Sequence, residues 1–298
     1  MKKFRNYLPV AFAAMALIAT SCDDKNDPTP EPGQESESAT VNPSQVFTQG
    51  VPTQVGDYVI TTDASGRVTK IVNDDEITTF DYNPKATRAV SVPADYDMTM
   101  NVEWGNDEDG VDFYIKLNKQ GFIEYAYEID EDKLDGDTAE EWWFTYNEIG
   151  QLIQMKRTEG DNEITDITYN DNGDIVSVKV SDDDAPKGKT NSTVSYTSEQ
   201  YPLGIANKSG IMLYDQTFLI DMDEMAPAFY AGLLGKATTQ LPMSAIGTNT
   251  EGYVDSYKFV WTLNEQGMPI RFDSSNTFTS PWTGETSTNT DEPIFFKW

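Results

Sequence analysis

The stretch VDFYIKLNKQGFIEYAYEI, residues 111–129, decides how this chain folds. Apolar residues occupy every second position from Val111 to Leu117, and the alternation resumes after a short break at residues 118–121. A period of two residues is typical of a β-strand with one apolar and one polar face. We therefore predict a hairpin of two strands. The residues expected on the apolar face of the second strand are Ile123, Tyr125, Tyr127 and Ile129.

The break between the two strands, Asn118-Lys-Gln-Gly121, is a turn that the chain uses five times. Asn or Asp at the first position can bond its own backbone two residues on, and Gly at the last position adopts a positive φ. This chemistry closes a hairpin with a bulged glycine. The turns start 55, 29, 23 and 94 residues apart, which is too irregular for a solenoid or propeller. The other four turns are Asp63–Gly66, Asn147–Gly150, Asn170–Gly173 and Asn264–Gly267.

The same alternation recurs near the C-terminus, from Tyr257 to Leu263. We predict a single all-β domain over residues 50–298, an antiparallel meander of roughly ten or more strands curled into an incomplete or closed barrel. One short helix interrupts the meander near residues 223–234. Asp223 can cap its start and Gly235 its end. We expect this helix to plug one end of the curled sheet.

The N-terminus predicts an exported lipoprotein. Three basic residues precede a thirteen-residue apolar run, Leu8–Thr20, which is shorter than the ~20 residues of a membrane span and typical of a signal peptide. Small residues then precede Cys22, as in the lipobox of bacterial lipoproteins, where a thiolate accepts diacylglycerol. Cys22 is the only cysteine. We expect residues 1–21 to be removed and lipid on Cys22 to hold the protein on a membrane.

Residues 22–49 predict a stalk. They are acidic and rich in proline, so they bury too little apolar surface to fold, and the prolines keep part of the segment extended. The acidic run after Cys22 resembles the signal that displays Bacteroides lipoproteins on the outer surface. In enteric bacteria, an Asp at this place resembles an inner-membrane retention signal. We expect an outer-membrane lipoprotein that faces the cell exterior, with the periplasmic face as the alternative.

Composition excludes several kinds of chemistry. The net charge of −29 repels the phosphate backbone, so a nucleic acid partner is excluded. The chain has no histidine and a single cysteine, which removes Ser-His-Asp and Cys-His catalysis as well as metal sites built on imidazole or thiolate. We expect no cofactor, and a function without catalysis is favoured. An enzyme here would have to use carboxylates, Lys, Tyr or Ser.

Alternation alone does not say which face points outward. A membrane-spanning barrel also alternates, with its apolar residues outside. The final residues 294–298 resemble the assembly signal of such barrels. The expected strands are nevertheless shorter than the 9–11 residues that a span needs. A barrel that does not span a membrane is therefore the favoured prediction, and its interior could be packed or hold an open cavity.

The mature chain resembles a Bacteroides family of lipoproteins of unknown function with a porin-like fold. The resemblance rests on Cys22 with its acidic leader, on the Asx-x-x-Gly hairpins and on four further segments. It covers nearly all of residues 50–298. It implies an incomplete or curled antiparallel barrel, and it brings no catalytic residues to carry over. The four segments are Ala206–Tyr214, Tyr230–Lys236, Leu241–Pro242 and Tyr257–Gly267.

Trp142 and Trp143 are the most unusual candidate site residues. Neighbours on a strand point to opposite faces, so at most one lies in the core and the other could stack on a sugar ring. Plain packing is the simpler interpretation. The triplet Asp-Thr-Ala around Thr138 resembles an O-glycosylation motif of exported Bacteroides proteins. The acidic segments 107–109 and 130–137 do not match a calcium-binding loop, and we predict solvated turns there.

These observations together predict a surface-tethered lipoprotein that binds a glycan or another component of the cell envelope. Two other functions stay open. One is a glycan hydrolase that works with a pair of carboxylates. The other is a purely structural subunit of the envelope.

Overall fold

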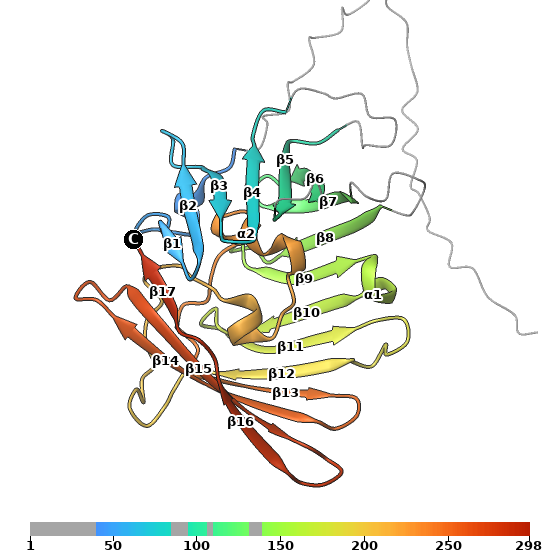
Figure 1. The fold of residues 1–298 in the computed structure, drawn as a ribbon, viewed down its shortest axis with the longest axis vertical. Coiled ribbons are helices and arrows are strands. Elements are labelled where there is room, and N and C mark those ends of the chain that lie inside the picture. Colours follow the sequence, from blue (N-terminus) through green and yellow to red (C-terminus); the bar gives the residue numbers. More distant parts are fainter. Residues whose placement is uncertain (1–39, 85–94, 106–109, 131–138) are drawn as a thin grey trace, which may run out of the picture. The chain divides into compact units, whose positions relative to one another are not determined.

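The strands form one closed antiparallel barrel (Figure 1). The computed structural model describes residues 40–84, 95–105, 110–130 and 139–298. The described strands are β1 (Gln54–Val55), β2 (Tyr58–Thr62), β3 (Val68–Val72), β4 (Glu76–Asp81), β5 (Met98–Trp104), β6 (Gly110–Leu117), β7 (Ile123–Asp130), β8 (Glu140–Tyr146), β9 (Leu152–Arg157), β10 (Ile164–Tyr169), β11 (Ile175–Ser181), β12 (Thr190–Ser195), β13 (Ser244–Asn249), β14 (Val254–Leu263), β15 (Pro269–Thr279), β16 (Thr286–Thr290) and β17 (Ile294–Lys297). Two short helices precede or connect the strands: η1 (Pro43–Gln45) comes before β1, and α1 (Glu159–Asn162) joins β9 to β10.

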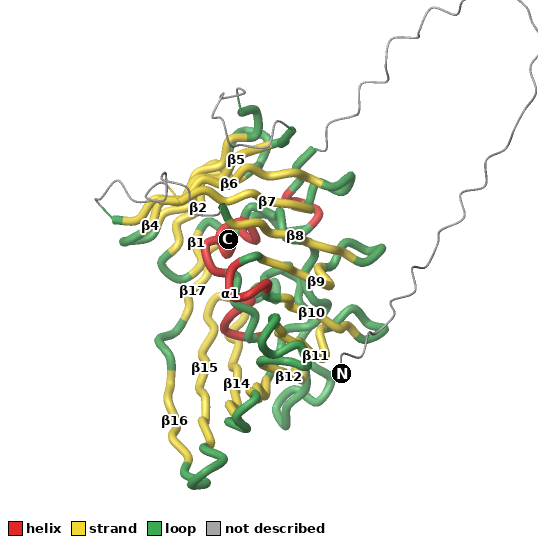
Figure 2. The backbone as a smooth tube through the Cα atoms, turned by 90° about the vertical axis from the view of Figure 1, so that its right-hand side faces the viewer, coloured by secondary structure: helices red, strands yellow, loops and turns green. Residues whose placement is uncertain are grey.

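The ring is closed by the last strand. From β1 to β15 each strand pairs with the next one along the chain, and β17 pairs with both β15 and β1. β16 and β17 follow one another along the same side of β15, so the two share one place in the ring. The long hairpin of β14 and β15 extends beyond the neighbouring strands together with β16 (Figure 2). The prediction of an all-β meander curled into a barrel is confirmed, and the barrel is closed.

The five predicted turns all close hairpins of this barrel. In the turn between β6 and β7, Asn118 Oδ1 accepts hydrogen bonds from the backbone N–H groups of Gln120 (2.9 Å) and Phe122 (3.1 Å). The last residue, Gly121, has a φ of 81°, and the matching glycines of the other four turns lie between 82° and 87°. The strand register shifts beside every one of these turns. The bulged-glycine hairpin predicted from the sequence is therefore confirmed at all five positions.

The bulge corrects the predicted inner face of β7. After the register shift, Ala126 lies opposite Ile115 and Glu128 lies opposite Phe113, so both point into the barrel. They are 0% and 7% exposed. A bulge adds one residue to the strand, and with a side-chain period of two this moves the following residues to the other face. Ile123 is buried as predicted. The residues Tyr125, Tyr127 and Ile129, predicted on the same face, point outward instead.

The interior of the barrel is filled by the chain itself. The connection between β12 and β13, residues 196–243, turns inward and occupies the middle of the ring, where it appears in gold and orange in Figure 1. We call this connection the plug. It contains the π-helical turn η3 (Tyr214–Phe218), the 3-10 turn η4 (Asp223–Met225) and the helix α2 (Ala226–Tyr230). Phe218 has no exposed surface, and Phe229 is 1% exposed. The predicted helix is present inside the barrel, as one part of a longer filling segment.

This helix is shorter than predicted and is not capped as predicted. It ends at Tyr230, and Gly232 with a φ of 75° follows, well before Gly235. The residue at the N-cap position of α2 is Met225, and no side chain caps the helix. Asp223 does not act as the cap, because its carboxylate contacts the guanidinium of Arg157 at 3.1 Å.

The folded unit also begins earlier than predicted. The segment around η1 packs on the plug, and Phe47 has no exposed surface. A Cβ placed on Gly210 of the plug would lie 2.1 Å from the carbonyl oxygen of Val46, so only glycine permits this approach. The predicted stalk over residues 22–49 therefore overlaps the folded unit in its last residues.

Most apolar residues of the described strands point inward, and some, such as Val260, are exposed. On β5, Met98, Met100 and Val102 are at most 1% exposed, while Thr99 and Asn101 between them face outward. A barrel that spans a bilayer carries its apolar residues on the outside. On β5 the arrangement is the opposite one. In the described part of the chain, no helix has the length and apolar character needed to cross a membrane.

Candidate functional site

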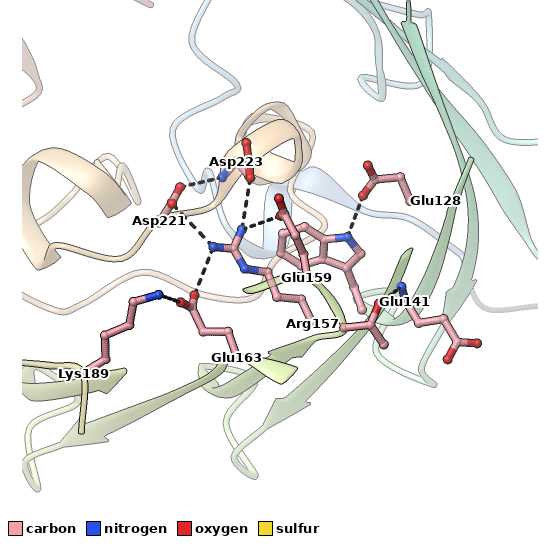
Figure 3. Close-up of polar contacts among 10 residues, drawn as sticks. Glu128, Glu141, Arg157, Glu159, Glu163, Lys189, Asp221 and Asp223 are labelled. Carbon is pink, nitrogen blue, oxygen red and sulfur yellow. Dashed lines mark hydrogen bonds and ion pairs between the residues drawn. The ribbon is translucent and has the colours of Figure 1, made fainter. Parts of the chain in front are cut away.

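Arg157 joins the plug to the barrel wall at the end of the barrel opposite the five Asx-x-x-Gly turns. It is the last residue of β9 and points inward (Figure 3). Its Nη1 lies 3.1 Å from Asp223 of the plug, and its Nη2 lies 3.0 Å from Glu163 of the wall. Glu159 and Asp221 lie slightly farther away, at 3.4 and 3.5 Å. The arginine side chain is only 8% exposed. One buried guanidinium therefore balances carboxylates from both parts of the structure.

Three further residues extend this network along the wall. The Trp142 indole N–H donates a hydrogen bond of 2.8 Å to Glu128, and the Arg157 guanidinium lies 5.3 Å from the centre of the Trp142 ring. Burial raises the pKa of Glu128 to about 7, against the lowering effect of the indole hydrogen bond. Glu163 also contacts Lys189 at 3.3 Å. The wall therefore contains one carboxyl group that titrates near neutral pH.

A cavity of about 360 Å³ lies between the plug and the wall at this end. We call it the acidic cavity. Burial raises the pKa of Glu76, although the Thr78 hydroxyl bonded to it acts in the other direction. Burial and a hydrogen bond with Asp223 also raise the pKa of Glu224. The acidic lining residues are Glu76, Asp215, Asp221, Asp223 and Glu224, and the aromatic ones are Tyr58, Trp104, Tyr214, Phe229 and Tyr230.

A second cavity, of about 300 Å³, adjoins the first. Asp215 and Asp221 line both cavities, so the two share a boundary. The second cavity adds Asp255, Tyr257 and several amide and hydroxyl groups of β12 and β13. Burial raises the pKa of Asp255. Together the two cavities can accommodate an elongated polar ligand with positive charge.

The outside of the barrel carries a row of aromatic side chains across β6, β7 and β8. Tyr114 and Tyr127 are opposite each other on β6 and β7, and Tyr125 and Trp143 are opposite each other on β7 and β8. The Tyr125 and Trp143 ring centres are 5.8 Å apart. Tyr96 continues the row, with its ring centre 5.1 Å from that of Tyr114. We call these five residues the outer aromatic strip.

An open groove of about 370 Å³ lies at one end of this strip. It is formed over β4, β5 and β6, and we call it the outer groove. Tyr96 and Tyr114 belong to both the strip and the groove. The Tyr96 hydroxyl is buried and has no hydrogen-bond partner within the described residues. A buried polar group without a partner is unusual and is satisfied when a ligand supplies one. The polar groove residues are Asp81, Asn83, Thr99 and Asp112.

The structure separates the two predicted tryptophans. Trp142 has no exposed surface, so it is not available for stacking on a sugar, and it serves the buried network instead. Trp143 is 39% exposed on the outer aromatic strip, and its role in glycan binding stays a prediction. Cys22 and Thr138 lie outside the described residues, as do residues 107–109 and nearly all of 130–137. Among the residues that are described, no group of three or more acidic side chains is arranged to hold a metal ion.

Sequence reasoning did not find the Arg157 network or the acidic cavity. Arg157 has a weak local signal, because it follows the inward-facing Met155 by two positions and is therefore a charge on the core face of a strand. Its partners come from the connection between β9 and β10 and from the plug, and the contact with the plug depends on how the plug folds back into the barrel. No spacing along the chain indicates that contact.

The fold and its sites define a class of protein: an antiparallel barrel filled by its own chain, with two polar cavities at one end and an aromatic strip outside. The chain belongs to the family described as a domain of unknown function (DUF4595) with porin-like fold, whose model matches residues 52–271. The predicted resemblance to such a family is therefore confirmed. Among curated proteins, none matches the chain significantly.

Solved structures similar to this chain include two porin-like proteins. One is from Bacteroides uniformis ATCC 8492, with 17% identity, a TM-score of 0.58, and 80% of this chain and 88% of the other covered. The second is from Bacteroides vulgatus ATCC 8482, with 13% identity, a TM-score of 0.47, and 83% and 98% covered. The first likeness supports the fold alone.

Proposed function

We propose that this protein is a lipid-anchored binding protein of the bacterial envelope. It binds a glycan on the outside of its barrel and does not hydrolyse it. The outer aromatic strip, with the outer groove at its end, is the observation that carries this proposal. Aromatic rings offer flat apolar faces that suit the apolar faces of sugar rings. A few convergent polar groups beside such rings fix the orientation of a ligand. The anchor itself rests on the sequence around Cys22.

Two details favour a binding role for the strip over plain packing. Trp143 stands on the outer face, where 39% of it is exposed although the barrel core is complete without it. Contiguous exposed apolar surface on a protein commonly marks a site of interaction. Tyr96, whose buried hydroxyl has no partner among the described residues, belongs to a groove whose other polar groups are carboxylates, an amide and hydroxyls. Sugar hydroxyls both donate and accept hydrogen bonds, so they match this lining.

The test is a glycan array probed with the full chain, followed by calorimetric titration of the glycan that binds best. Trp143→Ala is the informative variant. Trp282→Ala is the matched control, because Trp282 is 77% exposed and lies in the hairpin between β15 and β16, away from the strip. We expect Trp143→Ala to weaken binding by about tenfold, which corresponds to about 1.4 kcal/mol. Trp143→Phe should restore most of the affinity.

Two results would overturn the glycan proposal. The first is an array on which no glycan binds the full chain above background. The second is a bound glycan whose affinity is the same for Trp143→Ala and Trp282→Ala. If a second envelope protein co-purifies with the chain in either case, a structural role replaces glycan binding.

The anchor is tested separately. Cells that express the full chain are labelled with radioactive palmitate, with Cys22→Ala as the control variant. We expect label on the protein and its loss in Cys22→Ala, because the thiolate is the acceptor of the lipid. Protease added to intact cells should remove the barrel if it faces the exterior. Full protection of the protein in intact cells would place it on the periplasmic face instead.

A second function, glycan hydrolysis by carboxylates, has one observation in its favour. The acidic cavity contains several carboxyl groups, and Glu224 keeps its proton to a higher pH than an ordinary glutamate. A hydrolase of this kind needs one protonated and one ionised carboxyl group on either side of a glycosidic bond. The array glycans that bind are therefore incubated with the full chain, and reducing ends are measured. Formation of new reducing ends by the full chain, and its loss in Glu224→Gln, would establish this function. If no new reducing ends form, the function is excluded for those glycans.

A further inference from the structure

The acidic cavity combines carboxylates with aromatic rings and contains no compensating cation in its lining. Its five acidic residues come from β4, from the plug segment before η4 and from η4 itself. Among the described residues that line it, there is neither a lysine nor an arginine. Trp104 and Glu76 face each other on β5 and β4, so a ring and a carboxylate stand side by side on the inner wall.

The negative charge of this cavity is only partly balanced. Asp221 and Asp223 share the Arg157 guanidinium, as described above. Asp215 and Glu224 make no ion pair with a cation within the described part of the chain. Partly buried carboxylates without a counter-charge repel one another and hold protons more tightly. A ligand that brings positive charge into the cavity removes this repulsion.

Tyr230 adds an uncharged polar group without a protein partner to the lining of the acidic cavity. Tyr230 of α2 is only 9% exposed, and its ring packs between Phe229 (5.7 Å between ring centres) and Tyr58 (5.9 Å). The residue lines the acidic cavity, and its hydroxyl makes no hydrogen bond to any described residue. The oxygen itself is not among the buried polar atoms that lack a partner, so this hydroxyl can bond a ligand or water in the cavity. An ammonium group can donate a hydrogen bond to that oxygen.

The second cavity adds a second acidic region to the site. It shares Asp215 and Asp221 with the acidic cavity and adds Asp255 on the far side. The described carboxylates are spread along the two cavities and do not converge on one point, which fits separated positive charges better than a single metal ion. The chemistry therefore matches a linear molecule with an amine at each end.

We propose that the two cavities bind one elongated organic polyamine. One ammonium group lies among Glu76, Glu224 and the Tyr230 hydroxyl, against the rings of Tyr58 and Trp104. The other lies between Asp215 and Asp255. Charge-assisted hydrogen bonds to carboxylates and the attraction of a cation to aromatic faces supply the affinity. This site is separate from the outer aromatic strip, so it does not depend on glycan binding.

The experiment is calorimetric titration of the full chain with spermidine at about 150 mM NaCl, a concentration that screens contacts to exposed acidic residues. MgCl₂ is titrated in parallel as a small inorganic cation. We expect one saturable site for spermidine and no comparable site for Mg²⁺. Trp143→Ala should bind spermidine as the unmodified chain does, because that residue lies on the outside of the barrel.

Matched variants separate the cavity from the general acidity of the surface. Asp215→Asn with Glu224→Gln replaces two cavity carboxyl groups by amides, and Glu251→Gln with Glu265→Gln replaces two exposed carboxyl groups elsewhere. We expect at least about tenfold weaker binding in the first pair and less than about a twofold change in the second. Tyr230→Phe, which deletes only the hydroxyl, should weaken binding about threefold. Thermal unfolding without ligand checks that each variant folds.

Three results would overturn the polyamine site. One is the absence of saturable spermidine binding to the full chain. Another is an equal loss of affinity in the cavity pair and the surface pair, which would assign the binding to the overall charge of −29. The third is an equally tight Mg²⁺ site that is lost in the same cavity variants, which would assign the carboxylates to a metal.

Discussion

Glu128→Gln should make this protein more stable at alkaline pH and leave it unchanged at acidic pH. Glu128 points into the barrel from β7, is 7% exposed and accepts the Trp142 indole hydrogen bond at 2.8 Å. Glutamine has nearly the same shape and keeps an oxygen that can accept this bond. The substitution therefore removes the charge of the side chain while preserving its packing and its hydrogen bond.

The magnitude follows from the two pKa values of the carboxyl group. Burial raises the folded-state pKa to about 7, against an ordinary value of 4.5. Because the folded state holds the proton more tightly, ionisation destabilises it. The free energy of unfolding then falls as the pH rises from about 4.5 to about 7 and stays lower above that. The difference between the two pKa values corresponds to about 3 kcal/mol.

The assay is urea unfolding of the full chain and of Glu128→Gln at a series of pH values from 5 to 8. The contributions of other acidic groups cancel in the difference between the two proteins. We expect that difference to grow from less than about 1 kcal/mol at pH 5 to about 3 kcal/mol in favour of Glu128→Gln at pH 8. Glu124→Gln is the control, because Glu124 is exposed on the same strand and should give a small difference at every pH.

The reasoning would be refuted by a stability difference that does not change with pH. It would also be refuted if Glu128→Gln were the less stable protein at pH 8. Either result would mean that the ionised Glu128 is stabilised by the indole N–H and the nearby guanidinium more than it is destabilised by burial.

Three other substitutions test the fold. Arg157→Met should destabilise the protein by about 3 kcal/mol in urea unfolding, because it leaves buried carboxylates without their shared cation, and Arg157→Lys should recover part of the loss. Gly210→Ala should lower the melting temperature far more than Gly66→Ala. Both glycines have a positive φ, 76° and 84°, but only at Gly210 would a Cβ lie against backbone atoms. A similar fall in melting temperature for both variants would contradict this reasoning. Trp142→Ala should lower the free energy of unfolding by about 3–5 kcal/mol, and Trp143→Ala should lower it by less than about 1 kcal/mol. Equal losses would mean that the two rings do not differ in burial.

The hairpins could be predicted from the sequence because their causes are local. The Asx-x-x-Gly turn needs only one side chain that bonds its own backbone and one glycine with a positive φ, and all of these lie within five residues. The alternation beside each turn likewise reflects a period that every strand shares. The short helix near residue 225 was predictable for the same reason, although its caps were not, since Asp223 is engaged by a residue far away in the chain.

The candidate sites were less predictable. The sequence marked Trp142 and Trp143 as an unusual pair. Neighbouring residues on a strand point to opposite faces, as predicted here, but the sequence did not say which of the two rings was buried. A single bulge after Gly121 decided that Tyr125 and Tyr127 join Trp143 on the outside. From hydrophobicity alone, both tyrosines were predicted to face the interior. They face outward because a register shift of one residue moves the rest of the strand to its other face.

The sequence by itself therefore determined the strands, their turns, the antiparallel order and the absence of histidine and disulfide chemistry. The tertiary structure alone decided that β17 returns to β1, that most of the plug fills the barrel, and that Arg157 meets acidic groups from the connection between β9 and β10 and from the plug. The physical reason is the range of the interactions. A turn is fixed by neighbours along the chain, whereas a closed ring, a filled interior and a shared buried charge depend on segments that only folding brings together.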